Sequence, residues 1–223
     1  MKTNFLKIII FSSFLLSVLS VNLYGQTKPE QKNLNVAILV YDGIYLLDFT
    51  GPLEVFFDTF SADGEQLFNV YTVSPTKQFK AHTELNITAD FETGNCPKPD
   101  ILVVPGGNLQ LLKNNDSLKN WIIKSAEESQ IVMSVCTGAF ILADTGLLDG
   151  LNITTWYGAL DRLQEKVPSA KVLKGVRYTD NGKIITTAGV SAGIDGALFV
   201  VSKIFGKETA DRTAKYMDYE YWK

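Results

Sequence analysis

One cysteine stands at a place where it could act as a nucleophile. The apolar run from Gln130 to Val135 predicts a buried strand, Gly138 to Asp144 predicts a helix, and Cys136 lies at the corner between them. A sharp strand-to-helix turn exposes a nucleophile and turns the next backbone N–H towards an incoming substrate. The start of a helix also lowers a thiol pKa and favours the thiolate. A free cysteine is more often a small buried hydrophobe, but this corner favours the nucleophile.

A carboxyl and two glycines complete the candidate chemistry. Asp48 follows the apolar run from Asn35 to Tyr41 and lies near the start of a predicted helix. A carboxyl buried beside a thiolate would have a raised pKa and could act as a general acid or base. Aspartate also caps helix N-termini, and the two roles are compatible. Gly106 and Gly107 follow another buried strand, where a backbone N–H can approach a substrate closely as an oxyanion donor.

The supply of other reactive groups is small. The chain holds two cysteines, Cys96 and Cys136, and a single histidine, His82. A zinc site takes about four ligands, drawn mainly from cysteine and histidine, so we expect no metal, and no motif implies a cofactor. His82 would serve as a base for Cys136 only if the loop before Leu85 folded over the sulfur.

The predicted elements bring the candidate residues to one edge of a sheet. Strands are expected at 35–41, 67–73, 85–89, 100–104, 130–135, 153–155, 172–173, 176–178 and 183–187. Helices are expected at 46–60, 117–129, 138–144, 158–166, 191–205 and 207–217. The run from Asp180 to Gly182 predicts a tight hairpin turn. This alternation indicates an α/β fold with a mainly parallel central sheet, in which ligands bind beyond the carboxyl ends of the strands.

The first 25 residues are typical of a secretory signal peptide. Lys2 and Lys7 precede an apolar run from Ile8 to Leu19, and Gly25 offers a small residue for cleavage. The run is shorter than the roughly 20 residues needed to span a bilayer. We therefore expect a signal peptide at 1–25, a flexible lead-in at 26–34 and a single domain at 35–223. The protein would be exported, either periplasmic or secreted, with no stable membrane association after cleavage.

Composition and charge exclude several classes of partner. The chain has 223 residues, 46% of them hydrophobic, which is enough to bury a core without metals or disulfides. Its formal charge is −3, and it becomes −5 without residues 1–25, which contain two lysines and no acid. Nucleic-acid binding needs a concentrated basic face, so we expect a small-molecule substrate instead. Export favours disulfides, but the loop position of Cys96 and the apolar setting of Cys136 argue against a bridge.

Five stretches resemble the ThiJ/PfpI superfamily, a branch of the class I glutamine amidotransferase-like folds. They are AILVYDGIYLLDFTGPLEVF, DILVVPGG, SVCTGAFILADTGLLDG, TAGVSAGIDGAL and AKYMDYEYW. They are most similar to the isonitrile hydratase-like subgroup and to the sensor domains of some AraC-type regulators. The resemblance implies a flavodoxin-like three-layer sandwich and a homodimer. It also implies a reactive Cys136 on the elbow, an Asp48 in the LD-x-TGP motif that faces it, and a Thr137 that contributes to the site.

The chain departs from the resembled pattern at one place. Similar proteins commonly carry a histidine after the cysteine in a TTHW-like stretch, where this chain has Trp156 followed by Tyr157. Tryptophan has no basic nitrogen and cannot deprotonate a thiol, which argues against a Cys–His protease or amidase. Trp156 and Tyr157 are expected to line the pocket, although such side chains more often pack in the core.

These observations predict a cysteine-dependent hydratase or hydrolase for a small carbon–nitrogen substrate such as an isonitrile, nitrile or amide. The Cys136 thiolate would attack the electrophilic carbon, and Asp48 would protonate the developing anion or activate water. The N–H groups of Gly107 and Thr137 would stabilise the charge. One alternative is glyoxalase or deglycase activity on reactive carbonyls, although that branch usually has a glutamate at the place of Asp48. The other is a ligand-binding or redox-sensing module in which Cys136 is oxidised.

Overall fold

The computed structural model describes residues 33–111 and 115–222. The predicted signal peptide and most of the predicted lead-in lie outside the described residues, and the first strand begins at Leu34, within the range predicted as lead-in. Within 33–111 and 115–222, no helix has both the length and the apolar character that crossing a membrane requires. The same residues contain no cluster of acidic, cysteine or histidine side chains arranged to hold a metal ion.

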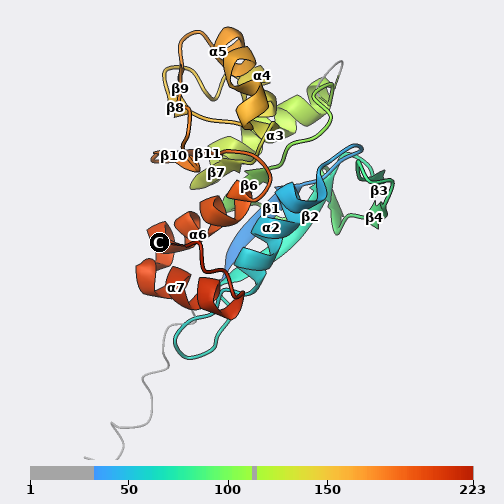
Figure 1. Cartoon of the computed structure of the whole chain (residues 1–223). Coiled ribbons are helices and arrows are strands. Elements are labelled where there is room, and N and C mark those ends of the chain that lie inside the picture. The colour runs from blue at the N-terminus through green and yellow to red at the C-terminus, as the bar shows by residue number, and fades with distance from the viewer. Residues whose placement is uncertain (1–32, 112–114, 223) are drawn as a thin grey trace, which may run out of the picture. The chain divides into compact units, whose positions relative to one another are not determined.

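A seven-stranded sheet in the order β10-β11-β7-β6-β1-β2-β5 forms the centre of the domain (Figure 1). All neighbours pair in parallel except β10 and β11, which form an antiparallel hairpin. The strands are β1 (Leu34–Leu39), β2 (Phe68–Ser74), β5 (Phe91–Glu92), β6 (Ile101–Val104), β7 (Ile131–Ser134), β10 (Tyr178–Asn181) and β11 (Ile184–Thr187). The sequence prediction of a mainly parallel α/β sheet is therefore confirmed.

Helices cover the sheet on both sides. Helix α2 (Leu46–Phe57) packs against α6 (Ala192–Phe205), and α6 packs against α7 (Lys207–Tyr216). Figure 1 shows the second group on the other side of the sheet. It comprises α3 (Asp116–Glu128), α4 (Gly138–Asp144), α5 (Leu160–Lys166) and the short helix η2 (Tyr157–Ala159). Because both faces are covered, every residue of the central strands β6 and β7 is buried.

The shortest elements are where sequence expectation and structure differ. Two small two-stranded sheets are separate from the central one in their strand pairing. They comprise β3 (Gln78–Lys80) with β4 (Asn86–Thr88) and β8 (Asn152–Ile153) with β9 (Lys171–Val172). Strands β3 and β5 carry too few apolar residues for the pattern to indicate them. The hairpin turn is centred on Gly182, whose φ is +83°, and Asp180 and Asn181 belong to β10.

The register of the central strands places three strand ends side by side. Val104 of β6 pairs with Ser134 of β7, which in turn pairs with Thr186 of β11. Two residues further along, the chains reach Gly106, Cys136 and Ala188. The segments that follow β6 and β7, in which candidate catalytic residues were expected, therefore lie side by side at the carboxyl edge of the sheet.

Gly138 lets helix α4 begin directly against the end of β6. A Cβ at this position would lie 2.0 Å from the Val104 carbonyl oxygen and 2.9 Å from that of Pro105. We therefore expect Gly138→Ala to lower the free energy of unfolding by about 3 kcal/mol, since a backbone carbonyl cannot move aside as a flexible side chain can. Urea unfolding followed by circular dichroism measures the change.

The control is Gly94→Ala, because Gly94 has open space around its Cβ position and no positive φ. Its midpoint should stay close to that of the parent. Equal midpoints for the two variants would contradict the close approach of α4 to β6.

Candidate functional site

Cys136 occupies a strained corner directly after β7. Its φ is +56°, an uncommon value for a residue other than glycine and typical of a nucleophile elbow. Three bonds hold the corner: Cys136 N–H donates to the Ala188 carbonyl (3.0 Å), Thr155 Oγ1 donates to the Cys136 carbonyl (2.7 Å), and Val135 N–H donates to the Val104 carbonyl (3.0 Å). The side chain is 5% exposed, and both Cys136 and Cys96 are free thiols.

Asp48 points its carboxyl into the same place from helix α2. It is the third residue of the helix and Tyr45 is the N-cap, so the helix-cap interpretation of Asp48 is wrong. The side chain has no exposed surface. Oδ2 accepts a hydrogen bond from Gly106 N–H (3.0 Å), whereas Oδ1 is buried and has no partner among the described residues. A buried carboxylate oxygen without a donor costs free energy, which points to a functional reason for its position.

The carboxyl and the thiol perturb one another. Burial raises the pKa of Asp48 to about 6, although the Gly106 N–H, the Cys136 thiol and the positive charge of His82 all act to lower it. Burial and the negative charge of Asp48 raise the pKa of Cys136 to about 11. The sequence expectation of a lowered thiol pKa is therefore wrong, because these two effects outweigh the nearby backbone N–H groups. At neutral pH the pair is a carboxylate next to a thiol.

The two glycines after β6 orient the side chains around the sulfur. Gly106 N–H holds Asp48, and Gly107 N–H donates to Thr137 Oγ1 (3.2 Å). A Cβ on Gly106 would lie 2.6 Å from Asp48 Oδ2 and 2.7 Å from Thr137 Oγ1, so only glycine fits between them. Both N–H groups were expected to be free oxyanion donors; in the structure they are occupied, because the side chains they face lie within hydrogen-bond distance.

Backbone N–H groups of Thr137 and Val190 face the sulfur in place of the glycines. Each acts to lower the pKa of Cys136 by stabilising the thiolate. Val190 was not among the residues expected from the sequence. It follows β11 in a turn between Gly189 and helix α6, and its φ is +47°. The signal that could have found it is the glycine-flanked run after a buried strand, which ends at the same edge of the sheet as Cys136.

Trp156 and Tyr157 line a hollow next to the corner. It has a volume of about 410 Å³ and shares Thr155, Ala188 and Val190 with the surroundings of Cys136. Its lining is Thr154, Thr155, Trp156, Tyr157, Leu160, Gly175, Val176, Arg177, Ala188, Gly189 and Val190. The indole of Trp156 packs on Gly189, where a Cβ would lie 2.6 Å from Cδ1, and it is 39% exposed. Both aromatic side chains are thus available to a ligand.

His82 lies near Asp48 but not against the sulfur. Its ring stacks on Tyr45 with 4.2 Å between the centroids, and Nδ1 is 3.2 Å from the Ile44 carbonyl oxygen. Its charge lowers the pKa of Asp48, and within 33–111 and 115–222 no hydrogen bond joins it to Cys136. The loop before Leu85 therefore places His82 near the Asp48 carboxyl, and Asp48 is the group that interacts with the Cys136 thiol.

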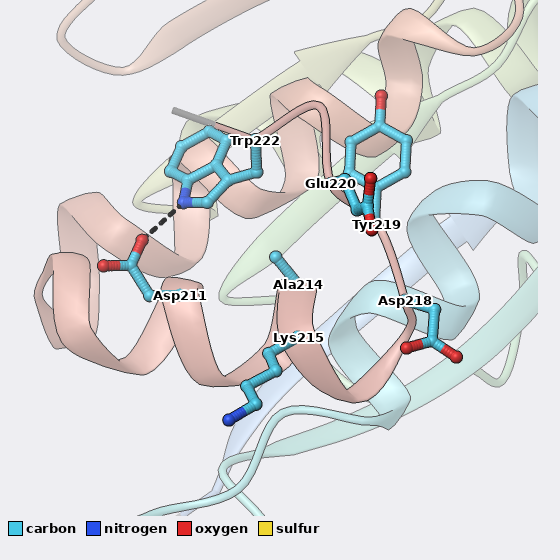
Figure 2. A pocket seen from close by; sticks show the side chains of 7 residues that line it. All are labelled: Asp211, Ala214, Lys215, Asp218, Tyr219, Glu220 and Trp222. Atoms are coloured by element: carbon cyan, nitrogen blue, oxygen red, sulfur yellow. Dashed lines mark hydrogen bonds between the residues drawn. The ribbon is translucent and has the colours of Figure 1, made fainter.

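Another hollow lies at the C-terminal end of the described chain (Figure 2). It has a volume of about 350 Å³ and is lined by Asp211, Ala214, Lys215, Asp218, Tyr219, Glu220 and Trp222. Figure 2 shows the bond from Trp222 Nε1 to Asp211 Oδ1 (2.8 Å) across one side of it. None of the residues around Cys136 belongs to this hollow, so the candidate site is the edge of the sheet.

Comparisons with known proteins identify relatives that cover most of this chain. Isonitrile hydratase from Pseudomonas putida is 30% identical over 187 residues, which cover 83% of this chain and 78% of that protein. The HTH-type transcriptional regulator GbdR from Pseudomonas aeruginosa is 26% identical over 86% of this chain, which spans only 53% of the regulator. A ThiJ/PfpI family structure from Pseudomonas syringae superposes with a TM-score of 0.75 at 23% identity, covering 88% of this chain and 81% of that one.

More distant structures share the fold as well. Drosophila melanogaster DJ-1beta superposes with a TM-score of 0.74 at 17% identity, over 85% of this chain and all of that one. The family model described as the DJ-1/PfpI family matches residues 34–203, which include the Cys136 corner, Asp48 and Val190. The resemblance inferred from the sequence motifs is thereby confirmed: the chain belongs to the DJ-1/PfpI family.

Proposed function

We propose that this protein is a cysteine-dependent hydratase that adds water to a small carbon–nitrogen substrate, with an isonitrile as the best candidate. The observation that carries the proposal is the Asp48 carboxyl, which lies beside the Cys136 thiol with one oxygen unpaired. A carboxylate with a pKa of about 6 is ionised at neutral pH and can take up a proton as the sulfur attacks. The isonitrile hydratase relative supports the substrate class.

The first half of the reaction joins substrate and sulfur. Cys136 gives its proton to Asp48 while sulfur forms a bond to the isonitrile carbon, and Asp48 passes that proton to the same carbon. The product is a thioimidate, in which the carbon is bonded to sulfur, hydrogen and nitrogen. Because the thiol has a pKa of about 11, it needs the carboxylate as a base at every turnover.

The second half adds water and releases the sulfur. A water molecule gives a proton to Asp48 as its oxygen bonds to the carbon, and Asp48 returns the proton to the nitrogen. The carbon–sulfur bond then breaks, the hydroxyl proton returns to sulfur by way of Asp48, and an N-substituted formamide leaves. The N–H groups of Thr137 and Val190 stabilise the thiolate as it departs. No step uses a metal or an added cofactor.

A Cys–His mechanism has less support. His82 contacts Ile44 and Tyr45, and Trp156 has no basic nitrogen. A ligand-binding module without turnover, as in a regulator, is the alternative that a negative assay would favour. We also propose that the mature protein is exported and acts in the periplasm or outside the cell, on the strength of the apolar run in the first 25 residues.

Asp48→Asn separates catalysis from stability. The amide keeps the shape of the side chain but cannot cycle a proton, so the rate of isonitrile hydration should fall by about 10² to 10⁴. The variant should also be more stable than the parent by about 3 kcal/mol at pH 8, because a pKa raised from 3.8 to about 6 means that the folded state disfavours the ionised carboxyl. Thermal unfolding and formamide production measure the two effects.

The stability gain should vanish at pH 4 or below, where Asp48 is protonated in the folded protein. His82→Ala is the control and should change the rate by no more than about threefold, since His82 acts only through the charge near Asp48. Loss of activity in His82→Ala with full activity in Asp48→Asn would overturn the assignment of the base.

The pH dependence follows from the same group. Because the carboxylate form of Asp48 takes the thiol proton, kcat/KM for an isonitrile should rise as the pH increases through about 6. Below that pH, activity should fall about tenfold per unit. Stopped assays between pH 4.5 and 9 measure the profile. A rate that is flat across pH 6, or that rises only near pH 9, would contradict Asp48 as the base.

We further propose a homodimer. Large apolar side chains remain exposed around the site, and they include Tyr45, Leu47, Trp156, Tyr157 and Val190. Such side chains are typical of an interface when they gather on one surface. Sedimentation equilibrium of residues 26–223 at micromolar concentration should give the mass of two chains. A monomer at that concentration would contradict the proposal.

A further inference from the structure

Two residues in the left-handed backbone region meet at the sulfur. Cys136 has a φ of +56° and Val190 a φ of +47°. For a β-branched residue such as valine this region is a genuine outlier. A strained conformation persists only where the surrounding contacts over-determine it. The turn around Val190 must therefore be held by groups outside it.

The backbone of Arg177 is joined to Cys136 through one residue. Arg177 lies just before β10, and its carbonyl accepts a hydrogen bond from Ala188 N–H (2.9 Å). The Ala188 carbonyl in turn accepts from Cys136 N–H (3.0 Å). The first residue of the turn is thus tied to Arg177 on one side and to the nucleophile on the other.

The side chain of Arg177 holds the other end of the same turn. One of its terminal nitrogens donates to Ser191 Oγ (3.2 Å), and the guanidinium pairs with Asp195 Oδ2, to which Nε donates at 2.7 Å. Ser191 is the N-cap of α6, but its side chain makes no capping bond and accepts from Arg177 instead. Arg177 therefore spans the turn, with its backbone at Ala188 and its guanidinium at the start of α6.

Asp195 is itself fixed from the C-terminal segment. It is buried on α6, and Tyr219 O–H donates to its Oδ1 (3.1 Å). Figure 2 shows the Tyr219 ring pointing away from Asp211 and Lys215. With Arg177 on Oδ2 and Tyr219 on Oδ1, both oxygens of Asp195 are satisfied, so the guanidinium has one well-defined position.

We propose that Arg177 is a positioning residue, whose ion pair with Asp195 and backbone bond to Ala188 hold the turn from Ala188 to Ser191 so that the Val190 N–H stays against the sulfur of Cys136. A role of Arg177 in catalysis rests on the proposed function, whereas its effect on the reactivity of the Cys136 thiol does not. The groups that face the sulfur are the Asp48 carboxyl from α2, the Tyr41 phenol, and the N–H groups of Thr137 and Val190. Arg177 acts on the last of these.

The test is the rate at which iodoacetamide alkylates each cysteine, followed by mass mapping between pH 7 and 9. Loss of one N–H donor destabilises the thiolate, so Arg177→Met should alkylate at Cys136 about tenfold more slowly than the parent at a fixed pH, with the same slope against pH. A turn that is merely loosened would expose the sulfur and speed alkylation. The two explanations therefore predict changes of opposite sign.

Two controls belong to the experiment. Cys96, which lies in a loop apart from the site, should alkylate at an unchanged rate in every variant. Lys203→Met removes a different ion pair of α6, between Lys203 and Asp180 of β10 (2.8 Å), and should leave the rate at Cys136 unchanged. A Cys136 rate in Arg177→Met equal to or faster than that of the parent would overturn the proposal, as would equal slowing in Lys203→Met.

Arg177→Met leaves the buried Asp195 without its cation, which can prevent folding. Arg177→Lys keeps the charge but lacks the planar fork that reaches both Asp195 and Ser191, and it should slow alkylation at Cys136 by about threefold. Parent-like alkylation in this variant would also overturn the proposal. Because alkylation needs no turnover, failure of the hydratase assay alone would contradict the proposed function and leave the role of Arg177 standing.

Discussion

The Asp48 carboxyl and the Cys136 thiol share one proton and one negative charge in a place that is almost completely buried. Burial raises both pKa values, that of Asp48 to about 6 and that of Cys136 to about 11, and the negative charge of the carboxylate adds to the rise at the thiol. In the resting pair the proton therefore lies on the sulfur and the negative charge on the carboxylate. The surrounding backbone holds the two groups together, with the Gly106 N–H on Asp48 and the Ala188 carbonyl on the Cys136 N–H.

Glycines allow the backbone segments around this pair to approach one another closely. Gly106 lies between Asp48 and Thr137 with no room for a Cβ, and Gly138 allows α4 to begin against the carbonyls of β6. Because Gly189 has no side chain, the Trp156 indole packs directly against the turn. The parallel strands β6, β7 and β11 end in register, so these close approaches fall at one point. Each of these contacts is short because glycine has no side chain to keep the neighbouring atoms away.

The sequence predicted the sheet, the corner and the partner of the cysteine, because these depend on local patterns. Apolar runs mark buried strands, and the carboxyl ends of parallel strands meet at one edge. Asp48, Cys136 and Gly106 followed from that rule as candidates, and the resemblance to the ThiJ/PfpI superfamily added that Asp48 faces Cys136. The sign of the thiol pKa could not be predicted, because it depends on burial and on a charge contributed by a residue far away in the chain. Val190 was missed because its contribution is a backbone N–H, which no side chain marks in the sequence. The proximity of His82 to Asp48 was not predicted, because the path of a loop does not follow from local sequence patterns.

A thiol with a pKa of about 11 is also a protected thiol. At pH 7 about one molecule in 10⁴ carries the thiolate, against about one in 30 for an ordinary cysteine thiol of pKa about 8.5. Peroxides and disulfides react with the thiolate and need access to it, and the Cys136 side chain is 5% exposed. The resting protein would therefore lose few molecules to oxidants, even in a compartment without reducing thiols. The same carboxylate that opposes ionisation of the thiol also slows its oxidation.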